Sequence, residues 1–234
     1  MKKPGIYDAD GNLVCELTKE DVEMDYALEF SSEYQDREVE VVIPEGTTKI
    51  GSYAFYNCPS LVSVTIPNSV TKIGQSAFEQ CSFLKQISIP DSVKEIGVDA
   101  FTDCVSLKSI QIPKGCKIDN WAFFGAGLIE IKIFDDVTIG DFAFSYCRSL
   151  QKIRFSSNLT EISKNAFKLC DVLKYVKLPD HIKKIDAYAF EGCLSLSTVI
   201  YDDMAFTNKF VLVTCLKQNG VILGEDIFDR TKLH

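Results

Sequence analysis

The dominant feature of the chain is an internal repeat with a period of 21 to 23 residues. One unit reads IPNSVTKIGQSAFEQCSFLKQI, and the next reads IPDSVKEIGVDAFTDCVSLKSI. Seven such units run in tandem and close at Tyr201; they start at Ile43, Ile66, Ile89, Ile112, Ile133, Phe155 and Leu178. A period of this length predicts a solenoid, in which each unit buries its inner face only by stacking on its neighbours.

Each unit contains one alternating stretch and one inward cluster. Val64 and Ile66 would lie on one face of a strand and Ser63 and Thr65 on the other, which is the pattern of a half-buried strand. Pro67 follows and ends the strand because it has no N–H to donate. Ala77-Phe78 and Cys81 then predict an inward cluster on a short helical or 3₁₀ arc. Stacked strands would lie about 4.8 Å apart in a parallel ladder.

The pattern IPxSVxxIGxxAFxxCxSLxxI resembles the BspA-like class of leucine-rich repeats over residues 41–201. The resemblance implies an α/β fold: a right-handed solenoid with a concave parallel β-sheet and short helical or 3₁₀ arcs on the convex side. It also implies a role in adhesion or protein–protein binding, often on microbial surfaces. The predicted function is therefore a non-enzymatic protein-interaction scaffold, with a structural or self-assembling solenoid as the alternative.

The two flanks are predicted to cap the open ends of the solenoid. In residues 1–40, Asp10-Gly11 indicates a hairpin, and Thr18 with Asp21 three residues later indicates a capped helix. In residues 202–234, Asn219-Gly220 between two apolar stretches (210–216 and 221–223) indicates a C-terminal hairpin.

The charge of the chain is concentrated at one end. Net charge is −8, and residues 1–40 hold 12 Asp and Glu against 4 Lys and Arg, so the remaining residues are balanced. This distribution argues against a nucleic-acid partner. No apolar run reaches the roughly 18 residues of a membrane-spanning helix, so membrane insertion is not expected. The N-terminus lacks the apolar region of a signal peptide, which predicts a cytoplasmic protein; removal of a leader would instead place it at the cell surface or outside the cell.

Six cysteines occupy one position of the repeat, and Ala126 fills that position in the fourth unit. They are Cys58, Cys81, Cys104, Cys147, Cys170 and Cys193. A position that accepts either Cys or Ala requires a small apolar group, so we expect a ladder of buried free thiols. The alternative is a stack of disulfides, but Ala126 divides the ladder into two runs of three, and neither run can pair completely.

Neither a metal, nor a cofactor, nor a catalytic constellation is predicted. No closely spaced cysteine pair and no HExxH, GxSxG, P-loop or GxGxxG motif occurs in the chain. The remaining alternative in this class is a small-molecule binder or an enzyme with its site in the caps.

Basic residues gather on the outward strand positions of units four to six. The predicted partner-binding patch consists of Lys132, Lys152, Arg154, Lys174, Tyr175 and Lys177. Stacked like charges repel each other and so have no packing reason to exist. The patch would bind a protein or another acidic macromolecule, and the acidic N-terminal segment makes self-association a second option. The alternative interpretation is a solvated lysine face.

The fourth unit is shortened and carries the sequence WAFFGAG. Alignment of the arcs places Trp121 beside Phe142 and Phe124 near Tyr146. The residue before each Ala-Phe pair is expected to be exposed, so these four aromatic residues could form a secondary contact surface. The alternative is that they cover the gap left by the shortened unit.

Overall fold

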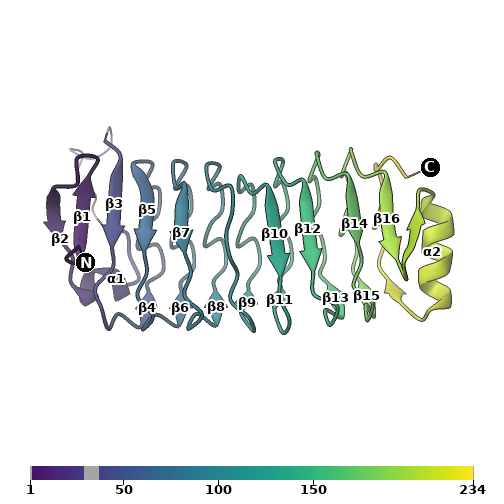
Figure 1. Ribbon diagram of the computed structural model, residues 1–234, viewed down its shortest axis with the longest axis horizontal. Coiled ribbons are helices and arrows are strands. Elements are labelled where there is room, and N and C mark those ends of the chain that lie inside the picture. The colour runs from purple at the N-terminus through teal and green to yellow at the C-terminus, as the bar shows by residue number, and fades with distance from the viewer. Residues whose placement is uncertain (1, 29–36, 234) are drawn as a thin grey trace.

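The computed structural model describes residues 2–28 and 37–233 and shows a parallel β-solenoid whose ends carry the two termini (Figure 1). One strand of most coils lies on the same side, which we call the first sheet. Its parallel strands are β3 (Val39–Val42), β5 (Leu61–Thr65), β7 (Gln86–Ser88), β10 (Glu130–Ile133), β12 (Lys152–Phe155), β14 (Tyr175–Lys177) and β16 (Thr198–Tyr201). The ladder is interrupted between β7 and β10 and between β12 and β14. The expected strand at residues 109–112 is therefore not formed. The right-handed winding and the concavity of this side stay predictions.

A second row of parallel strands, each two residues long, was not predicted. These strands are β4 (Lys49–Ile50), β6 (Lys72–Ile73), β8 (Glu95–Ile96), β9 (Lys117–Ile118), β11 (Thr138–Ile139), β13 (Glu161–Ile162), β15 (Lys184–Ile185) and β18 (Ile222–Leu223). The glycine that follows several of them permits the close stacking. A Cβ atom on Gly74 would lie 2.6 Å from the backbone nitrogen of Ser52 in the preceding coil, so only glycine fits there.

The return arcs are chains of turns rather than the helical or 3₁₀ segments that the sequence predicts. In the first arc, the N–H of Ala54 donates to Gly51 within the coil, whereas the N–H of Phe55 donates to Ala77 of the next coil (2.8 Å). Tyr53 and Asn57 adopt positive φ angles of 63° and 52°. Every second N–H therefore points along the solenoid axis and cannot form the regular bonds of a helix.

The core is a continuous stack of phenylalanine rings along the solenoid axis. Rings of successive coils are almost parallel, and their centroids are 5.1 to 5.7 Å apart. The stack contains Phe55, Phe78, Phe101, Phe123, Phe144, Phe167, Phe190 and Phe228. Seven of the eight are completely buried, so each coil supplies one ring that only its neighbours cover.

The ladder cysteines are buried free thiols, as predicted. The Sγ of Cys104 donates to the carbonyl of Phe78 at 3.1 Å, and that of Cys193 donates to Phe167 at 3.1 Å. The repeat position thus combines small size with a weak donor for the phenylalanine carbonyl of the preceding coil. Burial raises the pKa of the ladder thiol Cys81 to about 12, and it also raises the pKa of Cys116, which is outside the ladder, to about 11. A raised pKa disfavours the reactive thiolate.

We expect two of the nine cysteines to react with a thiol reagent in the native protein at pH 8. Cys15 is exposed and Cys215 is half-buried, whereas the other seven thiols are buried. Denaturation should make all nine reactive. Titration with a chromogenic disulfide reagent, with and without denaturant, checks the two counts. A denatured count below nine would reveal disulfides, and a native count well above two would contradict the buried ladder.

The N-terminal segment covers the first coil with a hairpin and a short helix. β1 (Gly5–Asp8) pairs antiparallel with both β2 (Leu13–Glu16) and β3. The helix α1 (Lys19–Glu23) begins with the capping box that its sequence predicts: Thr18 accepts from the N–H of Asp21, and the Asp21 carboxylate accepts from the N–H of Thr18 (2.7 Å). Val22 is completely buried.

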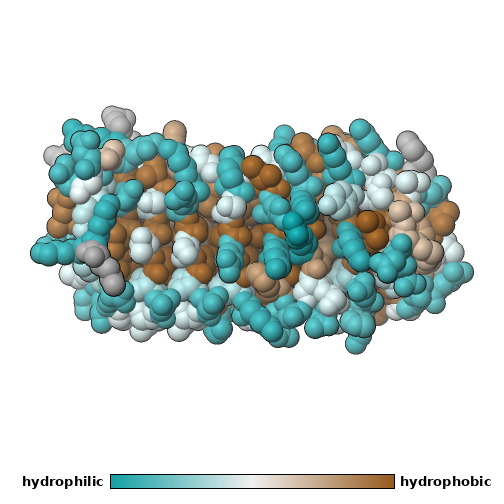
Figure 2. All heavy atoms as spheres, in the orientation of Figure 1, coloured by the Kyte–Doolittle hydropathy of each residue, from teal (hydrophilic) through white to brown (hydrophobic). Residues whose placement is uncertain are grey.

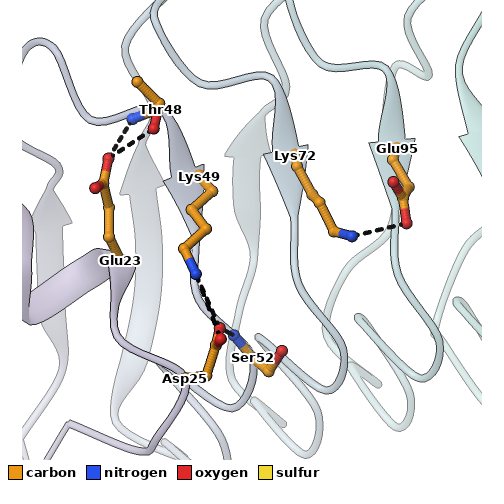
Figure 3. A network of polar contacts seen from close by, with 7 residues as sticks. All are labelled: Glu23, Asp25, Thr48, Lys49, Ser52, Lys72 and Glu95. Carbon is orange, nitrogen blue, oxygen red and sulfur yellow. Dashed lines mark hydrogen bonds and ion pairs between the residues drawn. The ribbon is translucent and has the colours of Figure 1, made fainter.

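Carboxylates of this segment replace the acceptors that a preceding coil would supply (Figure 3). In the repeats, the N–H of Thr71 donates to the carbonyl of Thr48. The N–H of Thr48 itself has no such coil before it and donates to the carboxylate of Glu23 at 2.6 Å. Asp25 similarly accepts from the N–H of Ser52 at 2.8 Å. Acidic residues at this end therefore satisfy main-chain donors of the first coil. Fewer of their carboxylates are then available to bind a second molecule.

Stability is expected to fall with acid at this end of the solenoid. Backbone hydrogen bonds from Thr48 and Ser52 lower the pKa of Glu23 and Asp25, respectively. A carboxylate with a lowered folded-state pKa stabilises the protein above its unfolded pKa of about 4, and that contribution is lost as pH falls through the folded value. The Glu23→Gln, Asp25→Asn variant should thus lose less stability than wild type between about pH 5 and pH 3.

Urea unfolding at several pH values checks this expectation. The control variant, Asp10→Asn with Glu16→Gln, changes two exposed carboxylates of the same segment and should keep the wild-type slope. Equal acid sensitivity of all three proteins would contradict the capping role of Glu23 and Asp25.

The C-terminal hairpin prediction is wrong. Lys209–Gln218 form a helix, α2, and Asn208 caps it by accepting from the N–H of Phe210 at 2.9 Å. Leu212 and Leu216, four residues apart, lie buried on one side of it. This helical spacing and the Asn cap outweigh the strand-like composition of the segment.

The repeats also continue past residue 201, which is the end of the repeat region predicted from the sequence. β17 (Met204–Phe206) pairs antiparallel with β16, and β18 pairs parallel with β15 in the second row. The ring of Phe228 stacks on Phe190 at 5.7 Å. Residues 221–233 therefore form the back half of an eighth coil, on whose open side α2 lies (Figure 1).

Candidate functional site

The strands of the predicted patch place their basic residues on one face of the first sheet, where Lys152 is half-buried and the others are exposed. In the pairing of β10 with β12, Glu130 lies opposite Lys152 and Lys132 lies opposite Arg154. β14 contacts β12 and contributes exposed residues, Tyr175 and Lys177, at the corresponding positions; the Lys174 side chain just before it is also exposed. The regular period explains why the sequence could place these six residues together.

This half of the face differs from the other half in chemistry. Figure 2 shows hydrophilic side chains gathered over β10, β12 and β14, whereas paler and apolar side chains are visible over β5 and β7. The latter strands carry small neutral residues at the outward positions, such as Ser63, Thr65 and Ser88. The basic cluster is therefore a local feature and not a property of the whole sheet.

A hollow of about 430 Å³ lies between β12 and β14, where the ladder is interrupted. Four of the six predicted patch residues line it: Lys152, Arg154, Tyr175 and Lys177. Apolar residues form the rest of its wall, together with Ser157 and Asp180; they are Ile153, Phe155, Leu178, Pro179 and Ile200. Lys132 and Lys174 lie outside this lining. The hollow thus combines cationic groups with an apolar surface.

The repulsion predicted for the patch is partly neutralised by carboxylates. Arg154 Nε lies 2.6 Å from Glu130 Oε1, and Lys177 Nζ lies 3.0 Å from Asp203 Oδ1. The bond to Asp203 raises the pKa of Lys177. Lys132 Nζ lies 4.4 Å from the ring centre of Phe134. Within residues 2–28 and 37–233, Lys152 and Lys174 form no ion pair, so they are the least compensated cations of the patch.

The aromatic cluster is assembled on the arcs with the predicted contacts. Trp121 and Phe142 have ring centroids 5.4 Å apart, and those of Phe124 and Tyr146 are 4.9 Å apart. Trp121 is 40% exposed. The expectation that this arc position is generally exposed is wrong, because Ser76 at the same position is 2% exposed. Small side chains at this position fold into the arc, whereas the indole is too large to do so.

The part of the chain that the structure describes contains no cluster of three or more His, Cys, Asp or Glu residues able to hold a metal ion. Over the same residues, no helix has the length and apolarity needed to cross a membrane. The candidate site consists of polar, aromatic and apolar side chains on and beside the strands of the first sheet.

Comparison with known proteins identifies the repeat. The family model described as the BspA type leucine rich repeat region (6 copies) matches residues 32–138 and 117–233. The chain belongs to the BspA-type leucine-rich repeat family. The second match extends to residue 233, which agrees with the partial eighth coil of this family member. No curated protein matches the chain.

Solved structures similar to this BspA-type chain come from bacteria. A leucine-rich repeat protein from Bacteroides ovatus is 32% identical with a TM-score of 0.72, over 88% of this chain and 55% of that chain. A leucine-rich repeat protein from Eubacterium ventriosum is 22% identical with a TM-score of 0.51, over 83% of this chain and 52% of that chain, and shows the fold alone. The chain spans about half the length of both proteins.

Sequence reasoning missed the apolar wall and the two carboxylate partners of the patch. Phe155 carried a signal, because it stands where most units have Ile followed by Pro and is followed instead by Ser156. The Phe155 ring packs edge-on against the Phe167 ring, with centroids 5.6 Å apart. The coil that contains Phe155 therefore departs from the regular repeat. Asp203 carried no comparable signal, since it lies beyond the predicted repeats on the turn between β16 and β17.

Proposed function

We propose that the protein is a non-enzymatic interaction scaffold that binds an acidic region of a macromolecular partner through the basic patch. The observation that carries the proposal is the hollow between β12 and β14, in which Lys152, Arg154 and Lys177 surround Tyr175. A local positive site on a chain of net charge −8 would orient an approaching anion and speed its association. Membership of a leucine-rich repeat family supports a binding role, and adhesion is one form of it.

Self-association through the acidic N-terminal segment is a weaker second candidate. Glu23 and Asp25 bond to the first coil, and Glu38 and Glu40 pair with Lys85 and Lys2. A second molecule would have to compete with these contacts. The aromatic cluster around Trp121 is the other surface to consider, since the Trp121 side chain is 40% exposed.

The test is capture of partners from the organism that encodes the protein, using two double variants. Lys152→Glu with Arg154→Glu should abolish capture, because it reverses two charges of the hollow. Loss of the exposed Arg154–Glu130 pair and repulsion between Glu130 and the two introduced carboxylates should lower stability by about 1–2 kcal/mol, which leaves the protein folded. The matched control, Lys164→Glu with Lys183→Glu, reverses two exposed lysines that lie outside the first sheet, in the coils of β12 and β14, and should retain capture. Mass spectrometry identifies the proteins that wild type and the control variant retain and that the charge-reversed variant does not.

Salt provides an independent readout of the same binding. The Debye length falls from about 10 Å at 0.1 M to about 3 Å at 1 M, so capture should weaken strongly over this range. If the Lys152→Glu, Arg154→Glu protein retains the same partners with the same salt dependence, the patch is a solvated face and the proposal fails.

A further inference from the structure

Arg154 of the patch already binds a carboxylate of its own chain. Glu130 lies on β10 and reaches diagonally to Arg154 on β12, with Oε1 2.6 Å from Nε. The side chains are 45% and 56% exposed, so the pair stands at the surface beside the hollow and not beneath it. An external carboxylate that approaches Nε of Arg154 would compete with Glu130 for this donor.

The wall of the hollow indicates what must accompany that carboxylate. Phe155, Pro179 and Ile200 contribute apolar surface, and Tyr175 is 40% exposed beside them. A volume of about 430 Å³ is enough for a few side chains but not for a folded element. An acidic residue and an apolar residue two positions apart on an extended peptide lie on the same face, so such a pair would present both chemistries to the hollow.

The balance of charge argues for a ligand with few negative groups. Five basic residues belong to the patch, while Glu130, Asp180 and Asp203 bring three carboxylates to the same surface. A densely sulfated glycan gains its affinity from many uncompensated cations, which this surface lacks. An acidic peptide segment with one or two carboxylates fits both the charge and the apolar wall.

We propose that the hollow binds an extended acidic–apolar peptide segment of the partner, whose carboxylate displaces Glu130 from Arg154 while its apolar side chain contacts Tyr175 and Ile200. This inference rests on the proposed function of the patch. Glu130 then acts as an internal competitor that lowers affinity and selects ligands able to replace it. Exposed ion pairs contribute up to about 1 kcal/mol, which corresponds to about a fivefold change in affinity at most.

The probe is a synthetic peptide with Glu and Leu two positions apart, acetyl-Gly-Glu-Gly-Leu-Gly-amide, titrated by NMR against the full chain at low salt. Glu130→Gln should raise its affinity about two- to fivefold. The control Glu161→Gln removes one exposed carboxylate from the second row of strands and should leave the affinity unchanged. In an Arg154→Met background, Glu130→Gln should bring no gain, because the competitor acts through Arg154.

The outcomes separate the inference from the proposed function. If the peptide binds and Lys152→Glu with Arg154→Glu abolishes binding, but Glu130→Gln brings no gain over Glu161→Gln, the competitor role is overturned and the patch survives. Tighter binding of heparin than of the peptide would overturn the peptide assignment. If no variant binds either probe and partner capture is also insensitive to the charge reversal, the proposed function itself fails.

Discussion

Replacement of Phe101 by alanine is expected to lower the free energy of unfolding by about 3–5 kcal/mol. The ring of Phe101 is completely buried and lies parallel to Phe78 at 5.2 Å and to Phe123 at 5.1 Å. Its removal loses apolar burial and leaves a cavity in the middle of the stack, where adjacent coils can collapse only by breaking their hydrogen bonds. Urea unfolding monitored by circular dichroism measures the loss.

Phe83 provides the matched control for this prediction. It is also a phenylalanine of the repeat region but is 53% exposed, so Phe83→Ala should change stability by less than about 0.5 kcal/mol. Equal losses in the two variants would contradict the assignment of the core to the phenylalanine stack.

Deletion of residues 1–38 should promote aggregation of the protein. The deletion removes β1 and therefore leaves β3 as an unpaired edge of the first sheet. It also uncovers the core residues beneath Val22 and frees the N–H groups that Glu23 and Asp25 satisfy. Among the other apolar residues of this segment, Leu28 packs against the core and Tyr26 is 54% exposed, while Phe30 lies outside the described residues.

Size-exclusion chromatography with light scattering checks the deletion. A shorter deletion of residues 1–4 stops before β1 and should leave the protein soluble with a nearly unchanged melting temperature. A soluble protein without residues 1–38 that also keeps the wild-type melting temperature would show that this segment is not a cap.

The repeat predicts most of the fold because residues at the same repeat position of a solenoid have similar burial in each coil. Ile66, Phe78 and Cys81 recur at fixed intervals, and one inward position in one coil implies the same position in the next. The capping box of α1 was equally predictable, since Thr18 and Asp21 have the spacing that the hydrogen bonds require.

The remaining features depend on contacts that a period does not encode. The second row of strands is only two residues wide, too short to produce a recognisable alternation. The residues of α2 have a strand-like composition, and their helical form depends on the Asn208 cap and on burial of Leu212 and Leu216. The arcs depend on positive φ angles at residues such as Tyr53, which composition alone does not indicate.

The candidate site was predictable in position but not in detail. The period placed Lys132, Lys152 and Arg154 on neighbouring strands. It could not show that Arg154 turns toward Glu130, because the direction of a long side chain depends on its neighbours and not on its register. Nor could it show the interruption between β12 and β14, which creates the hollow.

Site-specific photo-crosslinking tests most directly whether the patch is the binding surface. A benzophenone amino acid would replace Tyr175, Trp121 or Tyr53 in turn; these side chains are 40%, 40% and 39% exposed, so access to the reagent is matched. The patch account predicts a crosslinked partner from position 175 and none from positions 121 and 53. A crosslink from position 121 without one from position 175 would contradict it and assign binding to the aromatic cluster.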